Sequence, residues 1–177
     1  TWLPLHDGFE RLADLARAGR ADPAAFDVAG FTWCLTGIAV LCGKVEGFAA
    51  AWLGHATALK GDLSARENLL YSAGLRRAPT RAAIDAALAT VGYTHVDGHL
   101  ARQMSAGQQR RVALARVLLL DSALWLLDEP TVNLDSGGQE MFGGMLQAHL
   151  ERGGLAVVAT HQRLPLPDSR LQGLELS

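Results

Sequence analysis

A short apolar run that ends in two adjacent carboxylates constrains this chain more than any other feature. Residues 123–127 read ALWLL, and Asp128 and Glu129 follow them directly. A nearly continuous apolar run of this length is typical of a strand that is buried on both faces of a parallel sheet. Open α/β sheets bind their ligands at the carboxyl ends of such strands, so we expect both carboxylates to face a ligand.

The two carboxylates fit the chemistry of phosphoryl transfer. A carboxylate at the end of the strand can bind Mg²⁺, directly or through water. The next carboxylate can polarise a water molecule that attacks a phosphoryl group. An Asp-Glu pair before Pro130 is more often a simple exit from a strand into a turn, but the apolar strand in front of it favours the functional interpretation.

A helix is predicted just before this strand. Ser105 is a suitable N-cap, and Gln108 follows three residues later, as in a capping box. Backbone amides at such a helix start form a site for phosphate oxygens, although Ser105 and Gly107 taken alone favour an ordinary capped helix. The apolar side of the helix carries Val112, Leu114, Ala115 and Leu118. The basic residues, which we expect to be available to solvent or to a partner, are Arg110, Arg111 and Arg116.

Three motifs in this order resemble the ATP-binding subunits of ABC transporters. They are Ser105-Ala-Gly-Gln-Gln109, Leu126-Leu-Asp-Glu-Pro130 and Asn133-Leu-Asp135. In that family the first motif is the signature that closes over ATP bound by the opposite subunit, the second is the Walker B strand and the third is the D-loop. The resemblance implies an α/β fold, a P-loop NTPase (ABC ATPase) core with a helical subdomain.

The same resemblance implies a role for each candidate site residue. Ser105, Gly107 and Gln108 would contact ATP, Asp128 would bind Mg²⁺, and Glu129 would be the general base. Asp135 would couple the two sites of a dimer. The apolar run at residues 155–160 is predicted to be another buried strand, and His161 after it is similar to the switch histidine that senses the γ-phosphate.

The phosphate-binding loop of this family is not recognisable. Such a loop reads G-x-x-x-x-G-K-[ST], and its amides, lysine and hydroxyl hold the phosphates and Mg²⁺. The chain offers only Gly43 and Lys44, with Val45 in place of the hydroxyl residue and Ile38 in place of the first glycine. We expect a turn at Gly43-Lys44, with an irregular phosphate loop as the second interpretation.

We therefore predict a divergent N-terminal segment over residues 1–50 and an ABC ATPase domain over 51–177, with a helical subdomain at about 62–105. Within the subdomain, Ser64 and Thr80 are the predicted helix N-caps. Three explanations for the N-terminal segment remain open: the sequence is a fragment or shifted reading of a longer gene, the loop has decayed, or a partner supplies it. The threonine at position 1 favours the first.

Residues 52–69 resemble one branch of the family, the haem-exporter ATPases of cytochrome c maturation. This branch carries a Leu-Gly-His turn, then Leu-Lys, then Glu-Asn-Leu, all of which occur here. The chain after His161 is similar to the same branch. The metal-sensing glutamine of the family has no match, since His55 and Ala56 occupy its neighbourhood, and we expect His55 to be a turn residue.

Composition limits which partners and which cellular locations we expect for the chain. The net charge of −2 gives no reason to expect nucleic acid as a partner, and an apolar fraction of 49% is enough for a core. Cys34 and Cys42 are expected to be buried free thiols. We expect no signal peptide, and the apolar residues 31–42 are too few to span a bilayer.

The expected function is ATP binding and hydrolysis for an ABC transporter, with haem as the exported substrate. The chain would then lie on the cytoplasmic face of the inner membrane and bind membrane-spanning subunits and a second ATPase subunit. One alternative is an ABC ATPase for another substrate, or one that acts in translation or DNA repair. The other is an impaired module that supplies only its signature motif in trans.

Overall fold

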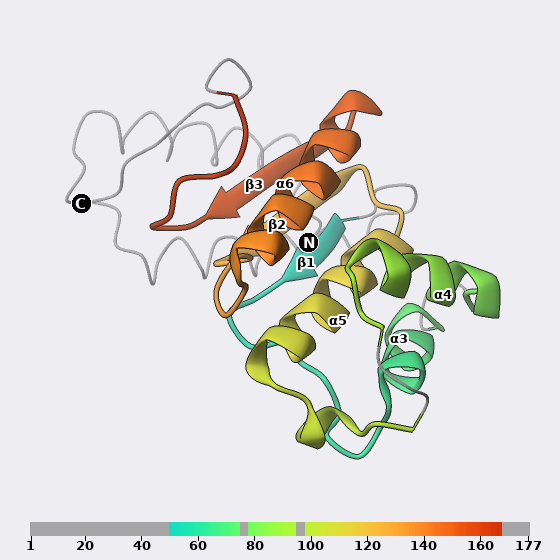
Figure 1. Cartoon of the computed structure of the whole chain (residues 1–177). Helices are drawn as coiled ribbons and strands as arrows, with labels where there is room; N and C mark the ends of the chain where they lie inside the picture. Colours follow the sequence, from blue (N-terminus) through green and yellow to red (C-terminus); the bar gives the residue numbers. More distant parts are fainter. Residues whose placement is uncertain (1–49, 75–77, 95–97, 168–177) are drawn as a thin grey trace, which may run out of the picture. The chain divides into compact units, whose positions relative to one another are not determined.

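A three-stranded parallel sheet organises the part of the chain that the computed structural model describes, residues 50–74, 78–94 and 98–167 (Figure 1). The strands are β1 (Ala50–Leu53), β2 (Leu124–Asp128) and β3 (Leu155–Ala159). The helices are α3 (Ala65–Gly74), α4 (Arg81–Thr90), the 3-10 turn η2 (Ala101–Gln103), α5 (Ala106–Leu119) and α6 (Ser136–Glu151). All described residues fall in one compact unit.

Strand β2 lies in the middle of the sheet, as its composition predicts. Leu53 of β1 is in register with Leu127, and Asp128 is in register with Ala159 of β3. Trp125, Leu126 and Leu127 are all buried. The predicted buried strand is confirmed, but it is shifted by one residue: it begins at Leu124 and ends at Asp128.

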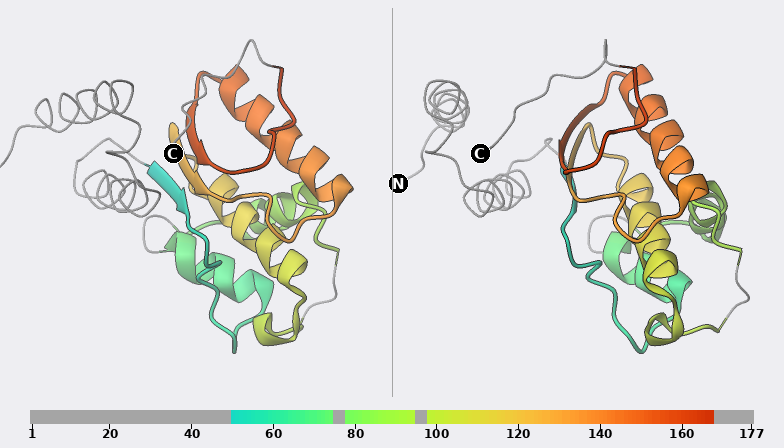
Figure 2. Two further views of the ribbon diagram at one scale, coloured as in Figure 1. Left: turned by 90° about the vertical axis from the view of Figure 1, so that its left-hand side faces the viewer. Right: turned by 60° about the vertical axis from the view of Figure 1, so that its left-hand side comes forward.

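Helices α5 and α6 lie on the same side of the sheet (Figure 2). Helix α5 begins where the capping box predicts: the Ser105 hydroxyl accepts a hydrogen bond from the Gln108 amide at 3.2 Å, and the Gln108 side-chain oxygen accepts one from the Ser105 amide at 2.8 Å. Helix α6 buries Phe142, Met145 and Leu146. The start of α5 lies beside the turn that follows β2, since Gly107 approaches the Asn133 carbonyl.

Helices α3 and α4 pack against α5 and against each other. Ser64 and Glu67 form a second capping box at the start of α3, where the Glu67 carboxylate accepts hydrogen bonds from the Ser64 amide at 2.7 Å and the Ser64 hydroxyl at 2.8 Å. The Thr80 hydroxyl caps α4 by accepting from the Ala83 amide at 3.2 Å. Both predicted N-caps are confirmed.

The prediction that residues 155–160 form a buried strand is wrong in one respect. Strand β3 forms, but Leu155 is 68% exposed and Val157 is 37% exposed. Residues two positions apart in a strand point to the same face of the sheet, so this face is open at Leu155 and Val157. An apolar run predicts a strand, but not how many neighbours cover it.

Several predictions lie outside the described residues. They concern the divergent segment before residue 50, the candidate nucleotide ligands Gly43 and Lys44, the thiols Cys34 and Cys42, the apolar residues 31–42 and the chain after 167. Within the described ranges, no helix has both the length and the apolar content needed to cross a membrane.

Candidate functional site

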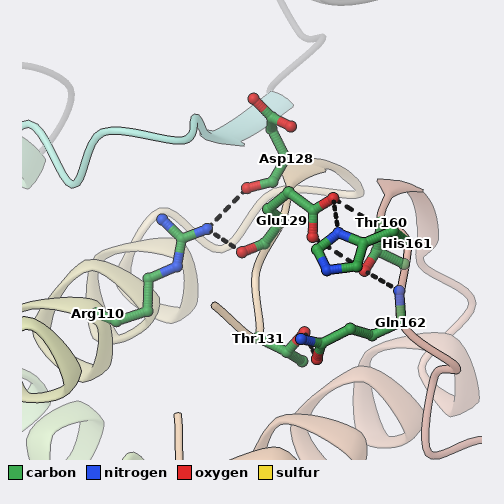
Figure 3. Close-up of polar contacts among 7 residues, drawn as sticks. All are labelled: Arg110, Asp128, Glu129, Thr131, Thr160, His161 and Gln162. Carbon is green, nitrogen blue, oxygen red and sulfur yellow. Dashed lines mark hydrogen bonds and ion pairs between the residues drawn. The ribbon is translucent and has the colours of Figure 1, made fainter. Parts of the chain in front are cut away.

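The carboxyl ends of β2 and β3 bring together a glutamate and a histidine (Figure 3). Glu129 follows β2, and its carboxylate accepts hydrogen bonds from the His161 amide at 3.2 Å and from the Thr160 hydroxyl at 3.2 Å. The same carboxylate lies 2.8 Å from Nδ1 of His161. The Glu129 side chain is 20% exposed and that of His161 is 71% exposed, so a ligand has access to the pair.

The backbone of Glu129 adopts a left-handed conformation with φ at 46°. This conformation is unfavourable for a residue with a side chain and persists only where the surroundings fix it. Here the Glu129 amide donates to the Ala159 carbonyl at 2.8 Å, which continues the link between β2 and β3 by one more hydrogen bond. The chain therefore turns sharply at the residue whose carboxylate faces His161.

The Asp128 carboxylate points away from that of Glu129 and is partly exposed (Figure 3). Within the described part of the chain, no hydrogen bond involves this carboxylate, so its oxygens are available to a cation. No group of three or more His, Cys, Asp or Glu side chains that could hold a metal occurs among the described residues. A single free carboxylate fits Mg²⁺, which commonly takes one or two carboxylates together with water and phosphate oxygens.

A second group of candidate residues gathers at the N-terminal ends of α5 and α6. Asp135 caps α6 by accepting from the Gly138 amide at 2.9 Å, and it forms an ion pair with Arg111 at 2.8 Å. The Gly138 amide first, and then Arg111, hold the pKa of Asp135 below its ordinary value. The capped turn that contains Ser105, Gly107 and Gln108 lies beside Asn133, whose φ is 65°.

The expectation that the arginines of α5 are open to solvent or to a partner is wrong for Arg110. Its residue surface is only 1% exposed, and its guanidinium donates to backbone carbonyls at the ends of β1 and β2. Arg111 and Arg116 are only partly exposed, and they bond to the Val91 carbonyl at 2.8 Å and the Thr57 carbonyl at 3.2 Å. The side chains of Arg111 and Arg116 therefore bond to backbone carbonyls of other parts of the fold.

Sequence reasoning missed three polar residues beside Glu129 and His161. Thr131 donates from its hydroxyl to the Gln162 side-chain oxygen at 3.0 Å, and the Gln162 amide donates to the Thr160 hydroxyl at 3.1 Å. The first bond joins the turns that follow β2 and β3, and the second lies within the turn after β3 (Figure 3). The available signal was their position, since each lies within two residues of a predicted site residue.

His55 lies in the bend that follows β1, as predicted for a turn residue. Its side chain is exposed, and its backbone carbonyl accepts a hydrogen bond from Arg110 at 3.2 Å. The neighbouring Ala56 is also exposed. This bend therefore contacts α5 through its backbone, and the side chains of both residues face outward.

Gly107 is expected to tolerate no side chain. A Cβ atom there would lie 2.7 Å from the Asn133 carbonyl oxygen, so Gly107→Ala should destabilise the fold by about 1–3 kcal/mol through overpacking, although alanine favours helices. Gly144→Ala is the matched control, because nothing lies within 4 Å of its Cβ position in α6. The control should stabilise the protein by about 0.5–1 kcal/mol. Urea unfolding of both variants measures the difference, and equal effects would contradict the contact.

Comparison with known proteins agrees with this arrangement. Residues 46–132 match the family model described as ABC transporter. The "Cytochrome c biogenesis ATP-binding export protein CcmA 2" of Cupriavidus metallidurans is 50% identical over 116 residues, which cover 65% of this chain and 55% of the relative. The CcmA protein of Xanthomonas oryzae pv. oryzae is 45% identical over 126 residues, covering 71% of this chain and 59% of the relative.

A solved structure shares the fold. The ATP-binding cassette MJ0796, in a dimeric post-hydrolysis state bound to ADP and Pi, superposes with a TM-score of 0.58 at 29% identity, over 65% of this chain and 53% of that one. The chain thus spans a little over half the length of the relatives it matches. The predicted α/β fold with a P-loop NTPase (ABC ATPase) core is confirmed. By its motifs, its fold and these matches, the chain is similar to the ATP-binding proteins of ABC transporters.

Proposed function

We propose that the chain is the ATP-binding and ATP-hydrolysing subunit of an ABC transporter that exports haem for cytochrome c biogenesis. The observation that carries the proposal is the contact of 2.8 Å between the Glu129 carboxylate and Nδ1 of His161, next to Asp128 at the end of β2. A base and its orienting partner at the carboxyl end of parallel strands are what phosphoryl transfer to water requires. The relatives named for cytochrome c biogenesis support the choice of transporter.

In the proposed reaction, Glu129 accepts a proton from the water that attacks the γ-phosphorus of ATP. The new bond joins the water oxygen to phosphorus, the bond from phosphorus to the β–γ bridging oxygen breaks, and ADP leaves. His161 orients the Glu129 carboxylate through Nδ1 and contacts the γ-phosphate. Asp128 would hold Mg²⁺, which stabilises the developing charge on the phosphate oxygens when it is bound.

The remaining residues act across a dimer in this proposal. Ser105, Gly107 and Gln108 bind the ATP of a second ATPase subunit, because the start of α5 presents backbone amides to phosphate oxygens. Asp135 couples the two sites from the start of α6. The assembly binds membrane-spanning subunits from the cytoplasmic face of the inner membrane, and nucleic acid is not a partner.

Calorimetry of Mg-ATP binding to the full chain tests the proposal. Saturable binding is expected, and Lys44→Ala should abolish it if Gly43 and Lys44 form an irregular phosphate loop. Absence of binding would instead favour the alternative in which the chain supplies only its signature motif in trans. A second assay separates these results: under the alternative, the chain restores ATP hydrolysis to a full-length relative whose own signature serine has been replaced.

A further inference from the structure

The guanidinium of Arg110 is bound entirely by backbone carbonyls. Nε donates to Pro130 at 3.2 Å, Nη1 to Gly54 at 2.9 Å and His55 at 3.2 Å, and Nη2 to Asp128 at 2.7 Å and to Glu129. Each N–H donor of the side chain therefore has an acceptor. Figure 3 shows the guanidinium between the α5 helix and the carbonyls of the two acidic residues.

Burying a charged side chain between a helix and a sheet is energetically unfavourable. Arg110 is 1% exposed, and its burial lowers the pKa of the guanidinium, while the nearby charges of Asp128 and Glu129 act in the opposite direction. Removing a charge from water is strongly unfavourable, and well-packed apolar residues often replace a buried charge without loss of stability. Packing alone therefore does not require an arginine here.

The bonds of Arg110 fall on the backbone of the candidate catalytic residue. Glu129 has its φ at 46°, and a hydrogen bond to its carbonyl fixes the orientation of the peptide that follows it. A bond to the preceding carbonyl, that of Asp128, fixes the peptide that enters Glu129. Both peptide planes around the left-handed residue are thus held by one nitrogen atom of Arg110.

We propose that Arg110 is a positioning residue that holds Glu129 in its left-handed conformation and so directs the Glu129 carboxylate to His161. Arg110 lies in the second turn of α5, the helix that Ser105 caps. The start of the signature helix is thereby connected to the candidate base of the same chain. Only the kinetic consequence of this role depends on the proposed function.

Arg116 offers a matched control on the same helix. Burial lowers the pKa of Arg116 as it does that of Arg110. Its guanidinium donates to the Thr57 carbonyl at 3.2 Å, in the loop after β1, and none of its hydrogen bonds reaches Asp128 or Glu129 within the described residues. Replacing Arg116 should therefore lower stability without altering the backbone of Glu129.

The test is the ¹⁵N NMR spectrum of the His161 imidazole in the full chain, recorded for Arg110→Lys, Arg116→Lys and Glu129→Gln. Glu129→Gln gives the signal of a ring that has lost its carboxylate. Lysine keeps the charge but lacks the planar fork that bonds both carbonyls. In Arg110→Lys we expect the ¹⁵N chemical shifts of the His161 ring to lie most of the way from the wild-type values to those of Glu129→Gln. In Arg116→Lys we expect these chemical shifts to equal the wild-type values.

Wild-type His161 signals in folded Arg110→Lys would overturn the proposal, as would an equal shift in Arg116→Lys. If Arg110→Lys does not fold, Arg110→Gln is measured instead, with the same criteria. If neither variant folds, while Arg116→Lys does, the arginine is a folding residue and the positioning role is rejected.

Measurements of kcat and KM test the positioning role of Arg110 separately from the proposed function. In a system that hydrolyses ATP, Arg110→Lys should lower kcat by about 10–100-fold with little change in KM, since misplacing a catalytic group by about 1 Å can cost 10²-fold. Absence of hydrolysis in the wild type would reject the proposed function and leave the NMR result intact. An unchanged His161 signal would reject the positioning role whatever the activity.

Discussion

Replacing Glu129 by glutamine is expected to slow ATP hydrolysis by roughly 10²–10⁴-fold, the usual contribution of a general base. Glu129 accepts from the Thr160 hydroxyl with one carboxylate oxygen and from the His161 amide with the other, each at 3.2 Å. The single glutamine oxygen can keep the bond from the His161 amide, and its NH2 group can donate to the Thr160 hydroxyl oxygen. Glutamine cannot accept a proton from water at neutral pH. The chemical step should therefore fail while ATP binding is kept, which phosphate-release kinetics and calorimetry measure on the same preparation.

Glu140→Gln is the control for this experiment. Glu140 is an exposed residue of α6, so its replacement removes the same charge from the same protein without touching the strand ends. Its hydrolysis rate should equal that of the wild type. If Glu129→Gln hydrolyses ATP at a similar rate to Glu140→Gln, another residue acts as the base and the proposed mechanism is wrong.

The second large effect is on stability, in the variant Trp125→Ala. Trp125 is 2% exposed in the central strand, and its ring stacks on that of His149 with centroids 3.9 Å apart. Removing a buried aromatic ring of this size costs about 3–5 kcal/mol, because apolar contacts are lost and a cavity remains. A domain of ordinary stability has only about 5–15 kcal/mol in total, so the variant should be close to unfolding.

Urea unfolding followed by circular dichroism measures this loss. Leu70→Ala provides the comparison, since Leu70 is a large apolar residue that is 49% exposed on α3. Surface substitutions away from special features usually change stability by less than about 0.5 kcal/mol. A loss below about 1 kcal/mol in Trp125→Ala, against the range expected for core aromatics, would show that the core does not depend on this ring.

The parts of the fold that sequence predicts are those set by neighbours in the chain. A capping box joins residues three positions apart, so Ser105 with Gln108 and Ser64 with Glu67 were predictable from spacing alone. The Asp128-Glu129 pair was predictable because parallel strands place ligands at one edge of the sheet. That same edge brings in His161, 32 positions from Glu129.

The hydrogen bonds of Arg110 could not be predicted from the sequence. Its partners are backbone carbonyls that lie between 18 and 56 positions away along the chain, and every residue type has such a carbonyl. No pattern of side chains can therefore mark the contact in advance. The same limit applies to Gly107, whose lack of a side chain matters only because the Asn133 carbonyl lies beside it.

Strand β3 has a practical consequence for work on the purified protein. Leu155 and Val157 expose apolar surface on a strand that, within the described residues, has a neighbour on one side only. A strand edge of this kind is a template on which further copies can add. Colloidal behaviour, rather than folding, should then limit the concentration at which the protein can be stored, and crystallisation or NMR samples would gain most from additives that cover apolar strand surface.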